Sequence, residues 1–198
     1  NLEVRGGPEN GGDGVVVEAG RTLLQNLTVA FHGGNGVRVG GKAAGKNANV
    51  WRIANLISLE NAGHGLYLSD QGSPANANAG LALGLDLRGN RGDGLRVEHA
   101  ADNTLHNVVA QLNRGAGVRL SPGARGNALW YPYVEANAGG ALHLEAGSQE
   151  NIVFGTRQGV VGDDYRNQGV RNLVVGRVPP VAVVAFCAAV GCLSGLAR

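Results

Sequence analysis

The chain has 198 residues, of which 34 are glycine, none is methionine and only 5% are aromatic. This composition does not suit a layered domain with a bulky core, and it favours repeated short strands and turns. The formal charge of +2 comes from scattered arginines without a lysine and arginine block, so a dedicated nucleic-acid-binding function is not predicted.

A six-residue pattern recurs along the chain: glycine, any residue, glycine, and then two apolar residues that flank a variable one. It occurs as GDGVVV from Gly12, GNGVRV from Gly34, GHGLYL from Gly63, GDGLRV from Gly92 and GAGVRL from Gly115, with a weaker copy, GGALHL, from Gly139. The distance in sequence from one copy of the pattern to the next accommodates several short strands and turns but no ordinary βαβ crossover. Each repeat is therefore predicted to form one coil of a solenoid.

The apolar residues of each pattern alternate like those of a strand and are predicted to point inward. This inward set consists of Val15 and Val17, Val37 and Val39, Leu66 and Leu68, Leu95 and Val97, and Val118 and Leu120. A second inward set consists of Leu27 with Val29 and Leu85 with Leu87. Stacked coil on coil at about the 4.8 Å strand spacing, they would form a narrow aliphatic core that needs few aromatic residues.

Asparagines recur at three positions of the repeat. The first set lies two residues before the first glycine, at Asn10, Asn61, Asn90, Asn113 and Asn137, with His32 in the remaining coil. The second set is Asn47, Asn76, Asn103, Asn127 and Asn151, and the third is Asn26, Asn55 and Asn107. Stacked asparagines tolerate left-handed turn geometry and hydrogen-bond the neighbouring coils, so these sets are predicted to be structural ladders.

This pattern resembles the right-handed parallel β-helix of the pectate-lyase-like superfamily over roughly residues 1–177. The resemblance implies an all-β solenoid of about six to seven coils. Members include polysaccharide lyases, polygalacturonases, surface adhesins and bacteriophage tailspikes, so the motifs specify the fold better than the function. A calcium-binding β-roll, the nearest alternative, needs nine-residue GGxGxDxUx repeats, and the period here is far too long.

Both ends of the chain depart from the repeat. An open apolar end before Asn1 would aggregate, so we expect further coils or a capping domain upstream. Residues 178–198 form an apolar C-terminal segment, which is long enough for a cap or subunit contact, a membrane helix or an unstructured tail. Pro179 and Pro180 favour the cap or subunit contact, and membrane insertion is not expected. The segment holds Cys187 and Cys192, which match no zinc or disulfide framework.

His64 is the first catalytic candidate, because GHG resembles the histidine motif of polygalacturonases, where paired carboxylates on neighbouring coils act as acid and base. The preceding coil has HGGNG without an aspartate, so that hydrolytic mechanism is not expected here. The alternative is a turn residue, since the same position holds different residues in other coils. Asp163 and Asp164 are the other candidates, as carboxylates that share a proton or bind a cation, or else as a solvated turn.

One column of outward residues is the candidate ligand-binding face. The residues of this column lie four positions after the first glycine of each coil. They are Val16, Arg38, Tyr67, Arg96, Arg119 and His143. Arginine side chains bind carboxylates or sulfates, and a tyrosine ring stacks on a sugar ring. A second column, two residues further on, holds Glu18, Gly40, Ser69, Glu98, Ser121 and Glu145. The alternative is that arginine and glutamate simply pair with one another on a solvated strand.

We therefore expect a polysaccharide-recognising β-helix domain of a phage tailspike, tail-fibre-like or surface protein, outside the cell or on the virion, with an acidic polysaccharide or cell-surface glycan as ligand. Tailspike relatives imply a homotrimer. A secreted polysaccharide lyase or glycoside hydrolase is the first alternative, and Tyr67, Arg96 and His143 have side chains suited to a lyase. The calcium-ligand aspartates of such lyases are absent, so no metal site and no cofactor are expected. A structural spacer or adhesin stalk is the second alternative.

Four aromatic residues are candidate sugar-stacking faces. Trp51, in the stretch NANVWRIANL, is predicted to be buried and to fill the core. The WYPY cluster of Trp130, Tyr131 and Tyr133 is interrupted by Pro132 and is the better candidate for an exposed platform.

Overall fold

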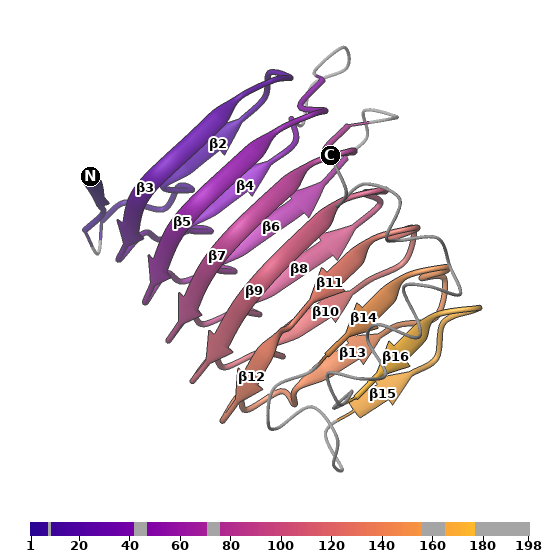
Figure 1. Cartoon of the computed structure of the whole chain (residues 1–198). Helices are drawn as coiled ribbons and strands as arrows, with labels where there is room; N and C mark the ends of the chain where they lie inside the picture. The colour runs from indigo at the N-terminus through magenta and orange to yellow at the C-terminus, as the bar shows by residue number, and fades with distance from the viewer. Residues whose placement is uncertain (8, 42–46, 71–75, 156–164, 177–198) are drawn as a thin grey trace, which may run out of the picture.

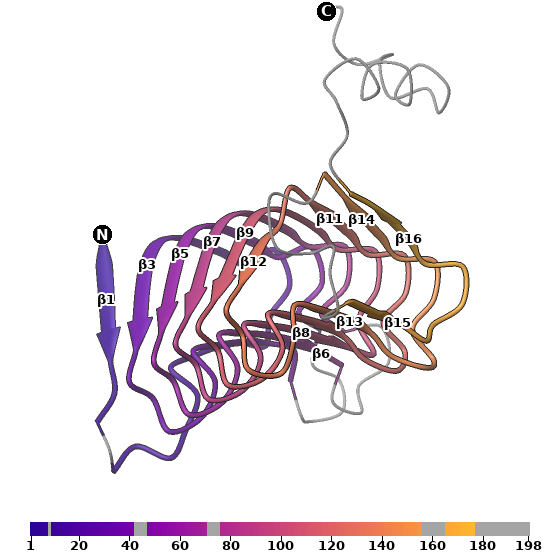
Figure 2. The same cartoon turned by 90° about the horizontal axis from the view of Figure 1, so that it is seen from below.

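In a computed structural model, which describes residues 1–7, 9–41, 47–70, 76–155 and 165–176, the chain folds into a solenoid of parallel strands. Successive coils add parallel strands to two sheets, and the coils follow one another in chain order (Figure 1). Seen from below, the two sheets form opposite walls of the solenoid, and β1 and β16 lie toward opposite ends (Figure 2). Among the described residues every regular element is a strand.

Sheet A is the larger wall. In spatial order it contains β1 (Leu2–Arg5), β3 (Leu23–Ala30), β5 (Arg52–Leu59), β7 (Leu81–Arg88), β9 (Thr104–Gln111), β11 (Ala128–Trp130), β14 (Ile152–Phe154) and β16 (Leu173–Val175), while β12 (Tyr133–Glu135) also pairs with β9. Sheet B contains β2 (Val15–Val17), β4 (Val37–Val39), β6 (Leu66–Ser69), β8 (Leu95–Glu98), β10 (Val118–Leu120), β13 (Leu142–Leu144) and β15 (Tyr165–Asn167).

The core lies between the two sheets and is aliphatic. Leu66 and Leu68 of β6 pair in register with Leu95 and Val97 of β8, and all four side chains are fully buried. Leu85 and Leu87 of β7 line the opposite wall. The two predicted inward sets are therefore confirmed, and their stacking explains how a chain with so few aromatic residues forms a core.

Three residues of the first asparagine set, Asn61, Asn90 and Asn113, form a buried ladder. The side-chain Oδ1 of Asn113 accepts the backbone N–H of Asn90 at 2.9 Å, and Oδ1 of Asn90 accepts that of Asn61 at 3.1 Å. Side-chain amides bond each rung to the next in the same way. The left-handed residue of each turn is not the asparagine but the one before it, such as Glu60 (φ 52°) and Leu112 (φ 58°).

The other two sets differ in burial. Asn103, Asn127 and Asn151 form a second buried ladder, which Asn172 continues by accepting the backbone N–H of Asn151 at 2.9 Å. The third set is exposed, and within it Nδ2 of Asn55 donates to Oδ1 of Asn26. Its asparagines adopt left-handed backbone, with φ of 53°, 55° and 54° at Asn26, Asn55 and Asn107, inside the long strands of sheet A.

No helix that could cross a membrane occurs among the residues that the structure describes. The apolar segment 178–198, with both cysteines, lies outside those residues, so its assignment as a cap or subunit contact stays a prediction.

Candidate functional site

The predicted column lies in register on sheet B. Arg38 pairs with Tyr67, Tyr67 with Arg96, Arg96 with Arg119, and Arg119 with His143 across neighbouring strands. β15 extends the column with Arg166, opposite His143. The repeat-based count missed Arg166, because the last coil has no glycine pair from which to count.

The column is less exposed than an outward position predicts. Arg38 is only 6% exposed and His143 8%, whereas Tyr67, Arg96 and Arg119 are half-buried. In the neighbouring column, Ser69 and Ser121 are buried and so do not form the predicted row of surface hydroxyls. The accessible part of the face is therefore its middle, on β6, β8 and β10.

The residues between the paired glycines form a further ladder. Oδ1 of Asp13 accepts the backbone N–H of Asn35, and Oδ1 of Asn35 accepts that of His64, each at 2.8 Å. Nδ1 of His64 accepts the backbone N–H of Asp93 at 2.8 Å, and Oδ1 of Asp93 accepts that of Ala116 at 2.7 Å. His64 is thus a rung of a repeat. The sequence carried this signal, because the position holds a hydrogen-bond acceptor in four successive coils.

Asp93 joins this ladder to the arginine column. The residue is 3% exposed, and its Oδ2 accepts the N–H of Nε of Arg119 at 2.9 Å and lies 3.9 Å from Nη1 of Arg96. Asp13 and Arg38 repeat the motif three coils earlier, with Nε to Oδ2 at 2.6 Å. The carboxylates were not predicted as partners, because each pair spans two coils.

Glutamates occupy the outer side of the same arginines. Nη1 of Arg119 donates to Glu145 at 2.6 Å, and Nη2 of Arg96 donates to Glu98 at 3.3 Å. The Tyr67 hydroxyl also donates to Glu98. Burial raises the pKa of Glu98, but the hydrogen bond from Tyr67 and the charge of Arg96 outweigh it and lower the pKa overall. The arginine charges are therefore balanced by neighbouring acids, as the pairing alternative predicted.

His64 is neutral in this environment. Burial is the largest effect and lowers its pKa, the carboxylate of Asp93 raises it, and the guanidiniums of Arg96 and Arg119 lower it further, with a net lowering. Because Nδ1 accepts a backbone N–H, the neutral ring carries its proton on Nε2. The imidazole lies 5.4 Å from the ring of Tyr67 and presents a donor rather than a base.

Stability is expected to fall as the pH drops from 7.5 to 5, because the fold also lowers the pKa of His106 and His143. A histidine with a lowered pKa binds protons more readily in the unfolded chain, so stability is complete above about pH 6.5 and is lost as the pH falls toward the folded pKa. Thermal melts across this range measure the drop. His64→Asn is the control, because Asn35 already makes the same ladder bond one coil earlier. If the stability of this variant falls as much as that of the parent between pH 7.5 and 5, His64 does not contribute to the drop.

The aromatic candidates lie on the other sheet. Trp51 is 1% exposed, as predicted. Trp130 is half-buried on the outer side of sheet A, where its ring stacks on His106 with centroids 6.1 Å apart. Tyr131 is exposed beside it. The structure therefore does not bring the WYPY cluster together with the sheet B column.

Asp163 and Asp164 lie outside the described residues, so they remain candidates from the sequence only. Within the described part of the chain, no group of three or more histidine, cysteine, aspartate or glutamate side chains is arranged to hold a metal ion.

Two comparisons with known proteins identify the fold. A family model described as the right handed beta helix region matches residues 2–157, so the chain belongs to the right-handed β-helix family. The A-module of mannuronan C-5 epimerase AlgE4 from Azotobacter vinelandii is similar in structure, with a TM-score of 0.55 and 19% sequence identity. The match covers 89% of this chain and 54% of that one, so the chain spans about half of that structure. No characterised protein matches the sequence.

Proposed function

We propose that the outer face of sheet B binds an acidic polysaccharide. The observation that carries the proposal is the in-register row of Tyr67, Arg96 and Arg119, half-exposed on three successive strands. Successive strands are about 4.8 Å apart, which is close to the length of one sugar residue. Neighbouring sugars of one chain would therefore meet equivalent side chains. A polysaccharide ligand is also supported by the similar epimerase module, whose name gives mannuronan as its substrate.

The acids beneath and beside the arginines hold them in place. Asp93 fixes Arg119 through Nε, and Glu145 holds Nη1 of the same guanidinium. Arg96 is held by Glu98 on one nitrogen. Side chains that are already fixed lose less conformational entropy when a ligand binds. A carboxylate ligand competes with Glu98 and Glu145 for these cations, so we expect modest affinity for one sugar and tighter binding for a longer chain.

Binding is favoured over cleavage by the state of the ionisable groups. Abstraction of a proton next to a uronate carboxylate needs an unprotonated base beside the substrate. The His64 ring offers an N–H, and the Glu98 carboxylate, whose pKa is lowered, already accepts the Tyr67 hydroxyl. The lyase and hydrolase alternative stays open for residues outside the described ones, notably Asp163 and Asp164.

The double variant Arg96→Gln with Arg119→Gln is expected to bind polygalacturonate about tenfold more weakly or worse, because two charge-assisted hydrogen bonds to the ligand are lost. Glutamine keeps an N–H group near Asp93 and so limits the damage to the fold. Isothermal titration calorimetry with polygalacturonate and with a sulfated glycan measures the loss, and a product assay detects unsaturated or reducing sugars.

The matched control is Arg91→Gln with Arg114→Gln, which removes the same charge from two exposed arginines of the preceding turns on the same coils. These two make no ion pair with described residues, so the fold should tolerate the change. Equal binding by both double variants would eliminate the sheet B face as the site. The tailspike or tail-fibre-like role, the location outside the cell or on a virion, and the homotrimer are parts of the same proposal.

A further inference from the structure

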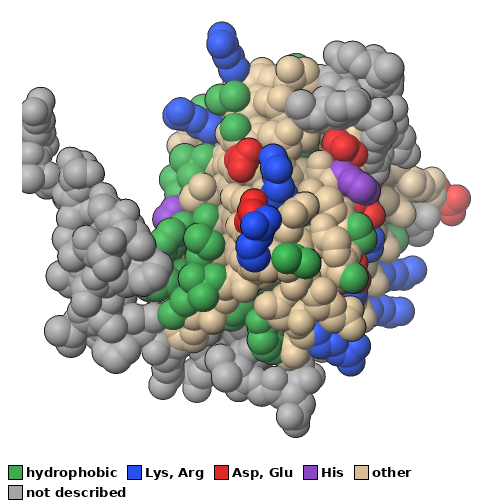
Figure 3. Space-filling view, turned by 90° about the vertical axis from the view of Figure 1, so that its right-hand side faces the viewer, with side chains coloured by type: hydrophobic (Ala, Val, Ile, Leu, Met, Phe, Trp, Pro, Cys, Tyr) green, Lys and Arg blue, Asp and Glu red, His purple; other side chains and the backbone are tan. Residues whose placement is uncertain are grey.

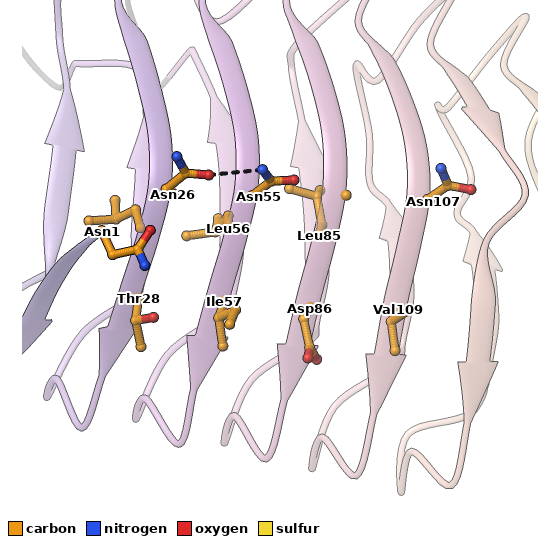
Figure 4. A pocket seen from close by; sticks show the side chains of 12 residues that line it. Asn1, Asn26, Thr28, Asn55, Leu56, Ile57, Leu85, Asp86, Asn107 and Val109 are labelled. Atoms are coloured by element: carbon orange, nitrogen blue, oxygen red, sulfur yellow. Dashed lines mark hydrogen bonds between the residues drawn. The ribbon is translucent and has the colours of Figure 1, made fainter.

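A groove on the outer side of sheet A is separate from the sheet B face. It has a volume of about 550 Å³ and crosses β3, β5, β7 and β9. Figure 4 shows two parallel rows of side chains along it. The space-filling view shows hydrophobic side chains gathered on the side of the molecule where sheet A lies (Figure 3). Trp130 and His106, stacked on the same outer side, lie on the strands at one end of the groove.

One row consists of asparagine amides and is interrupted. Nδ2 of Asn55 donates to Oδ1 of Asn26 at 2.9 Å, and Asn107 stands in the same row two strands further on. Between them β7 has Gly84, so no side chain reaches the row at that strand (Figure 4). Oδ1 of Asn55 and the amide of Asn107 therefore face a gap that spans two strand spacings, about 9 to 10 Å. A hydroxyl-bearing ring placed there could accept from one amide and donate to the other.

The second row gives the groove an apolar side. Ile57, which is 39% exposed, and Val109 lie on either side of Asp86. The Asp86 carboxylate is paired with Arg88, so the one acid in the lining is already neutralised. The described residues that line the groove include no lysine or arginine. Amide donors and acceptors beside aliphatic side chains suit a neutral sugar, whose hydroxyls are polar and whose ring face is apolar.

We propose that this groove is a second carbohydrate site, which takes a neutral sugar residue in the gap at Gly84. Its hydroxyls bond to Asn55 and Asn107, and its ring lies against Ile57 and Val109. The site is independent of the acidic-polysaccharide face, because the two lie on opposite walls of the solenoid (Figure 2). A heteropolysaccharide with both neutral and acidic residues could occupy both faces.

Gly84→Asn tests the proposal by filling the gap with the residue that the row lacks. Gly84 has φ 69°, and Asn26, Asn55 and Asn107 occupy the equivalent left-handed positions. A Cβ at Gly84 would approach only Oδ1 of Asn55, at 3.3 Å, which is the movable end of a side chain. The variant is therefore expected to keep the melting temperature of the parent. We expect the parent to bind a member of a neutral oligosaccharide array, and the variant to bind that same oligosaccharide at least about tenfold more weakly in calorimetry.

Asn107→Gly is the second variant, since glycine keeps the left-handed backbone and removes one of the two amides. This variant should also bind the neutral oligosaccharide more weakly. The double variant Arg96→Gln with Arg119→Gln should bind it as the parent does. No binding to any neutral oligosaccharide, or equal binding by the parent and Gly84→Asn, overturns the proposal. If Gly84→Asn weakens the binding of an acidic oligosaccharide and not that of a neutral one, the proposed class of ligand is wrong. Failure of the sheet B face gives a different result, namely polygalacturonate binding that is insensitive to the arginine variants.

Discussion

Replacement of Asp93 by alanine is expected to lower the free energy of unfolding by about 3 kcal/mol, because removal of one partner of a buried ion pair leaves the other charge uncompensated. Arg119 would lose the acceptor of its Nε, and Arg96 would lose a neighbouring carboxylate. The ladder would also break, because the backbone N–H of buried Ala116 bonds to the same side chain. Urea unfolding of the parent and the variant measures the difference.

Two controls separate the contributions. Asp93→Asn keeps an oxygen for the Ala116 N–H, as Asn35 does for His64, and removes only the charge, so it should cost less than alanine. Asp86→Ala removes one partner of the exposed pair with Arg88 and should cost less than about 1 kcal/mol. If Asp93→Ala is no more damaging than Asp86→Ala, the carboxylate does not organise the site.

The fold could be predicted because the coils repeat the same pattern of paired glycines and alternating apolar residues. Leu66, Leu68 and Val97 alternate with variable residues, and one face of each strand must be buried, so the inward set follows from the period alone. The buried asparagine ladders follow from the same repeat. The exposure of Asn26 and Asn55 could not be predicted, because it depends on which side of the sheet the left-handed kink opens.

The site was only partly predictable, because its contacts join different coils. The arginine column follows from register, since Arg96 and Arg119 occupy the same position of successive repeats. The pairing of Asp93 with Arg119 could not be predicted, because the two residues are 26 positions apart and the coils have unequal lengths. The shared arrangement of Asp13 with Arg38, 25 residues apart, was the available signal. Arg38 is buried although the half-buried Arg96 and Arg119 occupy the same position of the repeat, so its burial has no signature in the sequence.

Asn113→Ala is expected to lower the free energy of unfolding by about 1 to 3 kcal/mol, because it leaves buried polar groups without partners. Oδ1 of Asn113 accepts both the backbone N–H and the side-chain amide of Asn90, at 2.9 and 3.0 Å. Nδ2 donates to the carbonyl of Leu87 at 3.0 Å and to Oδ1 of Asn137 at 2.9 Å. The alanine variant removes all four bonds at a site that is 1% exposed, so water cannot easily replace them.

Asn26→Gly is the control for this loss. Asn26 belongs to the exposed row and shares one side-chain hydrogen bond with Asn55, and Gly84 shows that the same row tolerates glycine in left-handed backbone. The variant should therefore lose less than about 1 kcal/mol, since water satisfies an exposed amide. Asn90→Ala should resemble Asn113→Ala, because Asn90 makes the same bonds one coil earlier. Melting temperatures of Asn113→Ala and Asn90→Ala that equal that of the parent would show that the ladder follows from the coil geometry and does not stabilise it.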